Sequence, residues 1–199
     1  MIASEIELVP ANCLEPLDLP AIFGRVAPLE VDLGCGDGSF LSALAAQNPD
    51  NDFLGIERLL GRVHSACRRI ERAGLTNARV TRFEISYAVA YLLPPGSITA
   101  FYLLFPDPWP KRRHQFRRIF THAFLDAIAV TLEKHGVLRV ATDQLDYFHQ
   151  IERLSRTHSS FEVVESHDLV LPLTKFERKF REQGSPIYRL TLRKTSPVR

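Results

Sequence analysis

The stretch Val31-Asp32-Leu33-Gly34-Cys35-Gly36-Asp37-Gly38 decides the fold. It joins a short apolar strand, predicted over 29–33, to a helix predicted over 39–47, in which apolar residues recur at helical spacing. Glycines let the backbone turn tightly and approach a ligand closely. The spacing G-x-G-x-G differs from the G-x-G-x-x-G of a dinucleotide-binding fold. A strand, a glycine loop and a helix in this order indicate an α/β protein with a ligand site at the loop.

The rest of the chain continues this alternation of strands and helices. The predicted strands cover 29–33, 53–57, 78–83, 98–105, 137–141, 161–165 and 187–193. The predicted helices cover 39–47, 59–73, 86–93, 121 to about 134 with an end at Gly136, and 144–156. No obvious long helix separates the last two strands. We therefore expect an α/β fold with a doubly wound, mostly parallel, seven-stranded sheet and an antiparallel pair at one edge.

The 199 residues predict one domain over 29–199, preceded by an extension over 1–28 that wraps the surface and holds one helical turn near 17–23. The net charge is only +2, but no Lys or Arg precedes Arg25. The later chain therefore has a modest basic bias, which is compatible with a polyanionic partner. Most of the basic residues are arginines, which suit bidentate phosphate contacts, although genome composition alone can produce the same bias.

The cysteines and the apolar segments indicate a cytoplasmic protein without a membrane span. Cys13, Cys35 and Cys67 show no paired spacing, so we expect reduced thiols. The acidic N-terminus lacks the basic start of a signal peptide. Residues 85–106 carry no charge over 22 positions, but Pro94-Pro95-Gly96-Ser97 divides them into a helix and a strand. A His and a Cys one helical turn apart in 64–67 have no second pair, so we expect no metal site.

A second informative stretch is Phe105 to Arg118, which reads FPDPWPKRRHQFRR. Three prolines in five residues end the preceding strand and form a stiff loop. This loop fixes Asp107 and Trp109 at the strand end. A cationic run without an acid follows directly. Carboxylate, indole and cationic cluster together predict a place where a cation and a polyanion meet, although each feature taken singly is also typical of an ordinary surface turn.

Four acids, Asp32, Glu57, Glu84 and Asp107, fall at or near the carboxyl ends of successive predicted strands. That edge is where open α/β sheets bind ligands. An acid at the end of the second strand suits a ribose diol, and the acids beside the glycine loop suit a cationic ligand better than a pyrophosphate. S-adenosylmethionine combines an ammonium, a sulfonium and a ribose. The alternative is that Asp32 and Glu84 are only surface or loop-bonding acids.

These motifs together resemble the tRNA (guanine-N7-)-methyltransferase family. The resemblance rests on VDLGCGDG, FPDPWPKRRHQFRR, ATDQ and TKFERKFREQGSPIYRL, and it covers roughly 19–192. It implies a Rossmann-like class I methyltransferase fold, S-adenosylmethionine as cofactor and tRNA as partner. It also implies methyl transfer to N7 of guanine 46 in the variable loop. The oligomeric state stays open between monomer and homodimer.

The resemblance also implies roles for individual residues. Glu84 stands where the family usually has aspartate, and Phe116 stands where the family usually has a basic residue. Asp107 corresponds to the proposed catalytic residue, which also belongs to the cofactor site. The other expected cofactor-binding residues are Asp32, Gly34, Gly36, Gly38, Glu57 and Glu84. The expected RNA-binding or substrate-binding residues are Lys111, Arg112, Arg113, His114, Arg117, Arg118, Asp143, Thr174, Lys175, Phe176 and Glu177.

Several alternatives stay open at this point. Asp143 is as well explained as a helix N-cap, Trp109 as a core residue, and 174–177 as an ordinary charged loop. The whole chain can also be a methyltransferase acting on another RNA or on a protein, or a non-catalytic RNA-binding module. A nicotinamide-dependent oxidoreductase is a further class, but it predicts a third glycine one position later.

Overall fold

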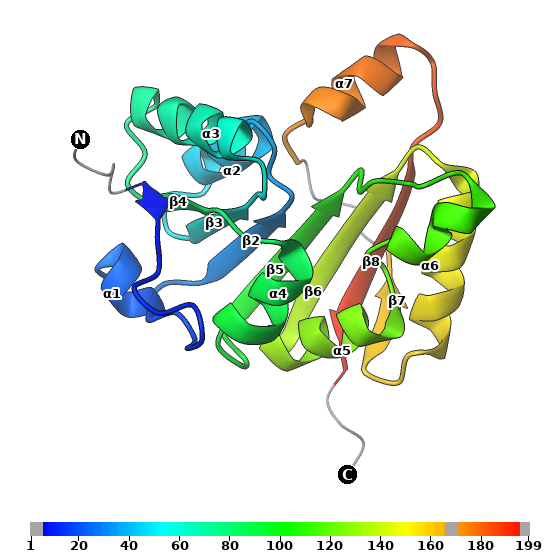
Figure 1. Ribbon diagram of the computed structural model, residues 1–199, viewed down its shortest axis with the longest axis horizontal. Helices are drawn as coiled ribbons and strands as arrows, with labels where there is room; N and C mark the ends of the chain where they lie inside the picture. Colours follow the sequence, from blue (N-terminus) through cyan, green and yellow to red (C-terminus); the bar gives the residue numbers. More distant parts are fainter. Residues whose placement is uncertain (1–5, 166–170, 196–199) are drawn as a thin grey trace.

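The computed structural model (Figure 1) describes residues 6–165 and 171–195. Residues 1–5 of the expected extension lie outside the described part of the chain, as do residues 166–170 and 196–199 of the expected domain. The described chain forms one sheet in the order β1-β4-β3-β2-β5-β6-β8-β7. The strands are β1 (Glu7–Leu8), β2 (Leu29–Leu33), β3 (Asp52–Ile56), β4 (Ala78–Thr81), β5 (Ile98–Leu104), β6 (Leu132–Thr142), β7 (Phe161–Val164) and β8 (Tyr188–Lys194).

The six neighbouring strands β1, β4, β3, β2, β5 and β6 are parallel. β8 runs antiparallel to both of its neighbours, β6 and β7. The expected α/β class, the mostly parallel sheet and the antiparallel edge are confirmed. The expected number of seven strands is wrong by one, because β1 adds an edge strand beside β4. Its two residues are too short to show an alternating pattern, and only the pairing with β4 defines the strand.

Helices cover both faces of the sheet (Figure 1). One apolar cluster joins the sheet to α2 and α3, and a second joins the opposite face to η1, α5 and α6. The helical segments are α1 (Leu19–Phe23), α2 (Ser39–Gln47), α3 (Leu60–Arg72), α4 (Ile85–Tyr87), the π-helix η1 (Ala88–Leu92), the 3-10 helix η2 (Arg112–Arg117), α5 (His122–Thr131), α6 (Leu145–Thr157) and α7 (Lys175–Glu182). Two cores on opposite faces make the sheet doubly wound.

The helix expected to continue to about residue 134 ends earlier. The carbonyl groups of Val130 and Thr131 accept hydrogen bonds from the backbone N–H groups of Gly96 and Ser97. These partners end α5 at Thr131, and the chain enters β6 directly. Gly136 is therefore not a helix cap. It lies inside β6, where an added Cβ would approach the β5 backbone to 3.0 Å.

The structure also contains a helix that the sequence did not predict. α7 lies between β7 and β8 and is only eight residues long. The Thr174 side chain caps it by accepting a hydrogen bond from the N–H group of Glu177. Figure 1 shows α7 above the carboxyl ends of β5 and β6, where it flanks the expected site.

Candidate functional site

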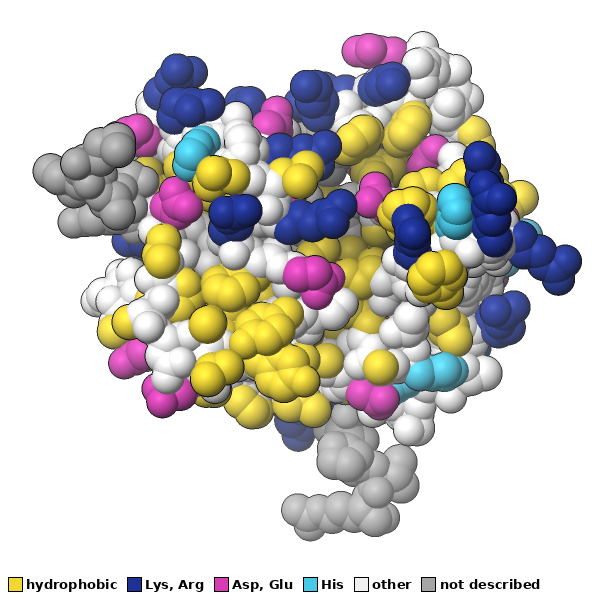
Figure 2. All heavy atoms as spheres, in the orientation of Figure 1, with side chains coloured by type: hydrophobic (Ala, Val, Ile, Leu, Met, Phe, Trp, Pro, Cys, Tyr) yellow, Lys and Arg dark blue, Asp and Glu magenta, His cyan; other side chains and the backbone are white. Residues whose placement is uncertain are grey.

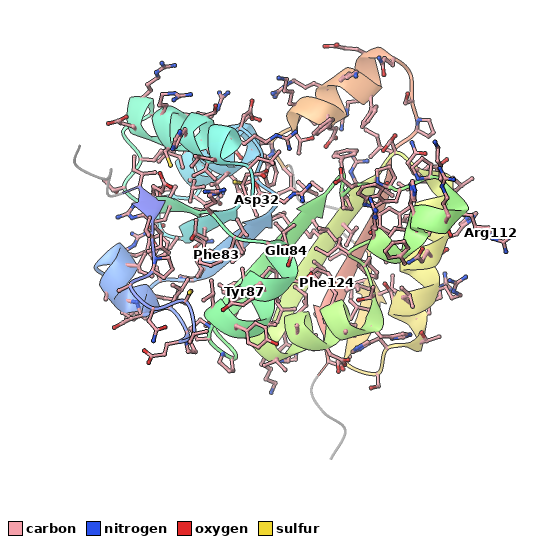
Figure 3. All side chains as sticks on the ribbon, in the orientation of Figure 1. Asp32, Phe83, Glu84, Tyr87, Arg112 and Phe124 are labelled. Atoms are coloured by element: carbon pink, nitrogen blue, oxygen red, sulfur yellow. The ribbon has the colours of Figure 1, made fainter. Side chains whose placement is uncertain are left out.

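The carboxyl edge of β2 to β5 brings the four expected acids to one side of the sheet. Asp32 lies in β2, and Glu57, Glu84 and Asp107 follow β3, β4 and β5. These strands are parallel neighbours, so their carboxyl ends meet at the same edge. Figure 3 labels Asp32 and Glu84 near this edge. The arrangement is the ligand-binding edge of an open α/β sheet.

The glycine loop between β2 and α2 requires glycine for two reasons. Gly34, Gly36 and Gly38 all have positive φ, at 82°, 57° and 74°. At Gly38 a Cβ would also lie 2.7 Å from the Cβ of Ala66 in α3. A side chain at that position would therefore push α3 away from the loop as well as strain the backbone. The loop is thus held tightly against α3 and exposes its outer backbone to the edge.

Asp32 and Glu57 form a buried acidic pair beneath this loop. Each residue is only 5% exposed. Burial, followed by the charge of Glu57, raises the pKa of Asp32 from its ordinary value of 3.8 to about 7. A cationic group placed beside Asp32 would offset this penalty and favour the carboxylate form. The site therefore favours a ligand with positive charge.

The raised pKa predicts that Asp32 makes the unfolding free energy depend on pH. Between about pH 4 and pH 7 the folded chain holds a proton that the unfolded chain releases. The contribution of Asp32 to stability is therefore largest at low pH and is lost as the pH rises through about 7. Urea denaturation of the wild type and of Asp32→Asn at several pH values measures this effect.

The Asp32→Asn variant serves as the reference because it removes this one titration and keeps the others. We expect it to gain stability relative to the wild type as the pH rises from 5 to about 8, because the asparagine carries no buried charge. Parallel stability curves for the two proteins over this range would contradict the raised pKa.

Glu57 and Glu84 hold local backbone groups as well as facing the edge. The Glu57 carboxylate accepts hydrogen bonds from the N–H groups of Gly36 at 3.2 Å and Leu59 at 2.9 Å. Each carboxylate oxygen has a second acceptor direction, so a ligand hydroxyl can still bind. Glu84 is exposed and caps α4 by accepting from the N–H group of Tyr87 at 3.0 Å. Glu57 is therefore the more rigidly positioned of the two acids.

Asp37, at the outer end of the glycine loop, differs electrostatically from Asp32. Burial acts to raise its pKa, but hydrogen bonds from Ser39 and the charges of Arg69 and Lys175 outweigh this and lower the pKa overall. Arg69 lies 3.5 Å from the carboxylate. Lys175 belongs to α7, so α7 acts electrostatically on the glycine loop although the two are far apart in sequence.

The proline loop after β5 is bent at two residues with positive φ. Phe105 has φ of 54° and Trp109 has φ of 41°, a region that residues other than glycine rarely occupy. Asp107 lies between them and is exposed. Non-glycine residues in this region are strained and persist only where the surrounding structure fixes them. The loop thus presents the Asp107 carboxylate outward from a constrained backbone.

Cationic side chains surround this loop. Lys111, Arg112, Arg113 and Arg117 are exposed on and beside η2. Figure 2 shows Lys and Arg side chains gathered over the upper half of the visible face, where α3, α7 and this loop lie. The four side chains form a cationic surface beside Asp107, which we call the η2 cluster.

Trp109 packs against the η2 cluster and lies outside the apolar core. The Arg117 guanidinium lies 4.8 Å from its ring centroid, and the ring of His114 meets it edge-on at 6.0 Å. The indole is half-buried. It therefore belongs to the site surface, held by neighbours of the same loop.

Arg118 differs from the cations just before it, because it is only 4% exposed. Its guanidinium donates to the Pro108 carbonyl, to Gln150 and to Asp146, and it lies over the Tyr147 ring. An RNA phosphate cannot reach it unless these bonds break. The structure therefore places Arg118 inside the fold, apart from the other expected RNA-binding residues.

The segment expected over 174–177 contains residues with different surroundings. Lys175 is exposed and Phe176 is half-exposed, with its ring 6.4 Å from that of Phe105 at the start of the proline loop. Glu177 is buried and forms ion pairs with Arg181 and with Arg189 of β8. Glu177 thus anchors α7 to the sheet, while Lys175 and Phe176 face the site.

Asp143 does not cap α6, which was the alternative for this residue. Its carboxylate accepts a hydrogen bond from the Gln144 side chain, and the N–H group of Gln144 donates to the Thr142 side chain. Asp143 is half-buried at the carboxyl end of β6. It therefore lies on the same edge as the other acids.

Sequence reasoning missed four side chains in this site. The ring of Phe105 lies 5.4 Å from the ring of Phe180, and this contact links the proline loop to α7. Arg62 of α3 approaches Glu57 to 3.8 Å. Asp146 and Gln150 hold Arg118 from successive turns of α6. The four-residue spacing of Asp146 and Gln150 places both side chains on one face of α6, but only the folded structure shows that they bind Arg118.

Comparison with known proteins identifies the fold and the family. Residues 26–190 match the family described as "Putative methyltransferase". The tRNA (guanine-N(7)-)-methyltransferase of Thermotoga maritima is 34% identical over 197 residues, covering 98% of this chain and 63% of that protein. The corresponding enzyme of Halorhodospira halophila is 37% identical over 183 residues, covering 89% of this chain and 79% of that protein. The chain thus spans less than two thirds of the Thermotoga relative.

Solved structures support the same class of fold. The 16S rRNA methyltransferase KamB superposes with a TM-score of 0.69 at 15% identity, over 92% of this chain and 95% of that one. The antibiotic-resistance methyltransferase Kmr gives 0.65 at 18% identity, over 96% of each chain.

The sheet order, the glycine loop and the acidic edge define a class I methyltransferase fold. Within this class, the chain belongs to the tRNA (guanine-N7-)-methyltransferase family. Over residues 6–165 and 171–195, no helix has both the length and the apolar content to cross a bilayer. In the same part of the chain, no three His, Cys, Asp or Glu side chains gather as a metal site would require.

Proposed function

We propose that this protein transfers a methyl group from S-adenosylmethionine to N7 of guanine 46 in the variable loop of tRNA, giving 7-methylguanosine. The observation that carries the proposal is the position of exposed Asp107. Asp107 follows β5, the sheet neighbour of the strand that carries the buried acid Asp32, and it directly precedes the η2 cluster in the chain. The buried acid suits a cationic cofactor, and the cluster suits RNA. The printed names of the relatives support the same chemistry.

The residues at the glycine loop fit S-adenosylmethionine on chemical grounds. Asp32 is a buried acid with a pKa raised to about 7, and a ligand ammonium would compensate its charge. Glu57 is fixed by two backbone N–H groups and retains acceptor directions for ribose hydroxyls. Glu84 lies exposed at the start of α4, after the next strand of the same edge, and we assign it to the adenine end of the cofactor. When bound, the cofactor supplies a methyl group activated by a positively charged sulfur.

The acceptor chemistry sets the task of Asp107. Guanine N7 has a free lone pair and lies on the major-groove edge of the base, so no side chain has to remove a proton. Alkylation at N7 places positive charge on the base. A carboxylate held nearby stabilises that charge and orients the base, and positioning of this kind contributes strongly to rate. The strained loop around Asp107 is suited to such a fixed carboxylate.

The exposed cations near the proline loop would bind the RNA backbone. The η2 cluster follows Asp107 in the chain, and exposed Lys175 begins α7, whose Phe176 ring lies 6.4 Å from that of Phe105 in the same loop. Phosphate contacts fix register and orientation without reading the base. Phe176 and Trp109 offer ring surfaces close to the same place. We further propose that the enzyme works in the cytoplasm, without a metal, as a monomer or homodimer.

Replacing Arg113 with alanine is expected to weaken tRNA binding about 10-fold at about 0.1 M salt, because one charge-assisted phosphate contact is lost. The slope of log affinity against log salt should fall in magnitude by about 1. Filter binding across a salt series measures both quantities. Arg72→Ala is the matched control, since Arg72 is an exposed arginine at the far end of α3. Equal salt slopes for wild type and Arg113→Ala would contradict the phosphate contact.

Radiolabelled methyl transfer to unmodified tRNA tests the proposed function. The label should appear as 7-methylguanosine after nucleoside digestion, and it should disappear when guanine 46 is changed to adenine. Transfer to a different nucleoside would redirect the assignment to another acceptor. Cofactor binding without transfer to any RNA or protein would refute it in favour of a non-catalytic binding module.

A further inference from the structure

Arg118 is bound on every side of its guanidinium. It donates to the Pro108 carbonyl at 2.8 Å, to Gln150 Oε1 at 2.7 Å and to Asp146 Oδ2 at 2.6 Å. Its carbon lies 4.7 Å from the ring centroid of buried Tyr147. Three of these partners belong to α6 and one belongs to the proline loop. The side chain is therefore a bridge between α6 and that loop.

The bridge reaches the loop at its most constrained point. Pro108 stands between Asp107 and Trp109, and its carbonyl is the group that Arg118 holds. Trp109 has φ of 41°, which a residue other than glycine adopts only when neighbouring contacts enforce it. The loop carries no helical or strand hydrogen bonding from Pro106 to Pro110. The buried Arg118 guanidinium is bonded to the middle of this segment and can hold the backbone of Trp109 in this conformation.

We infer that Arg118 is a positioning residue, which acts through the Pro108 carbonyl to hold the Asp107 carboxylate in its working place. This inference rests on the proposed methyl-transfer function and deepens it. Arg118 then sets the turnover rate, while the exposed cations of the η2 cluster set affinity for RNA. A guanidinium is needed because its planar fork can donate to three acceptors at once, whereas a lysine ammonium lacks this geometry.

A cavity beside the bridge gives solvent access to the Arg118 side chain and its acceptors. It has a volume of about 480 Å³, and it is lined by Pro108, Pro110, Arg112, Gln115, Arg118, Gln144 and Asp146. If the Arg118 side chain is removed, a free guanidinium ion can enter from this cavity and meet the same acceptors. Chemical rescue is therefore possible at this site.

The only tryptophan of the chain, Trp109, reports on the loop without any need for activity. In Arg118→Ala we expect acrylamide to quench Trp109 fluorescence about twofold more strongly, because the loop is no longer tied to α6. Guanidinium chloride at millimolar concentration should restore the wild-type quenching, and sodium chloride at equal ionic strength should not. Far-UV circular dichroism confirms that the variant is folded.

Kinetics test the consequence for the reaction. With S-adenosylmethionine and unmodified tRNA, Arg118→Ala should lower kcat about 30- to 100-fold, as expected for a displaced catalytic group. The KM for tRNA should change by less than about threefold. Arg118→Lys should remain impaired to a similar degree, because it keeps the charge and loses the fork. Guanidinium should raise the kcat of Arg118→Ala and leave Arg118→Lys and the wild type unchanged.

Two further variants complete the design. Arg156→Ala removes an exposed arginine from the last turn of α6, where it pairs with Glu152 of the same helix. It should leave quenching, kcat and KM at wild-type values. Asp146→Asn weakens the bridge from an exposed residue, so it should fold even if Arg118→Ala does not. Asp146→Asn should also lower kcat, but by a smaller factor than Arg118→Ala.

The outcomes separate this inference from the proposed function. A wild-type enzyme that methylates no guanine overturns the function, and the Trp109 quenching then still shows whether the bridge holds the loop. An active wild type with an unchanged kcat in Arg118→Ala and Asp146→Asn overturns the positioning role. A raised KM for tRNA with unchanged kcat and a flatter salt dependence also overturns it, because Arg118 would then be an RNA contact.

Discussion

Replacing Asp107 with asparagine is expected to lower kcat for methyl transfer to tRNA by about 100- to 1000-fold. The substitution preserves the shape of the side chain and removes its negative charge. Since the base gains positive charge during alkylation, the loss falls on the transition state. Asp107 is exposed, so we expect the melting temperature to stay within about 2 °C of the wild type.

Steady-state kinetics with saturating cofactor and tRNA measure this effect. Asp50→Asn is the matched control, because Asp50 is an exposed aspartate in the turn after α2. It should retain wild-type kcat. A wild-type kcat in Asp107→Asn would show that the carboxylate neither orients the base nor offsets its charge, and the catalytic assignment would fail.

Replacing Asp32 with asparagine is expected to weaken S-adenosylmethionine binding by at least about 100-fold, which corresponds to about 2.8 kcal/mol. The reason is the loss of a buried carboxylate partner for the ligand's positive charge. The same change should stabilise the unliganded protein above pH 7, because a buried charge with a raised pKa is removed. A binding site that costs stability is typical of functional positions.

Isothermal titration calorimetry at pH 8 measures the affinity, and experiments in buffers of different ionisation enthalpy count protons. At pH 6.5 the wild type should release a proton on binding, since Asp32 then becomes charged. Glu30→Gln is the control, because Glu30 lies on the same strand and bonds to Tyr102 and Asn51 away from the loop. Unchanged affinity in Asp32→Asn would remove Asp32 from the cofactor site.

Elements set by local signals were predictable from the sequence. The strand over 29–33 and the helix over 39–47 agree with β2 and α2, because glycines and apolar spacing define both of them within a few residues. The four acids lie at or just after the ends of their strands for the same reason. A parallel sheet then brings them together, so their shared edge could be deduced from sequence once the strands were placed.

The differences arise where a long-range partner decides the outcome. The helical pattern continues past Thr131, but hydrogen bonds from the turn after η1 end α5 there. α7 is short and mostly polar, and its packing against Phe105 and its ion pair to Arg189 come from distant segments. Short helices of this kind depend on tertiary contacts for most of their stability.

The same distinction applies to the cationic run. Arg117 and Arg118 are neighbours with identical side chains, and the sequence assigned both of them to RNA. Arg117 is exposed over Trp109, whereas Arg118 is buried against α6. The partners that make this difference, Asp146 and Gln150, lie about 30 positions later in the chain. Side-chain roles in such a run therefore require the fold.

The most direct test of the proposed function replaces a single atom of the acceptor. Two tRNAs are compared, one with guanosine at position 46 and one with 7-deazaguanosine, in which a carbon takes the place of N7. We expect labelled methyl transfer from S-adenosylmethionine to the first tRNA and none to the second, while both bind the enzyme with similar affinity. Equal transfer to both tRNAs would show that N7 of this guanine is not the acceptor and would contradict the proposed reaction.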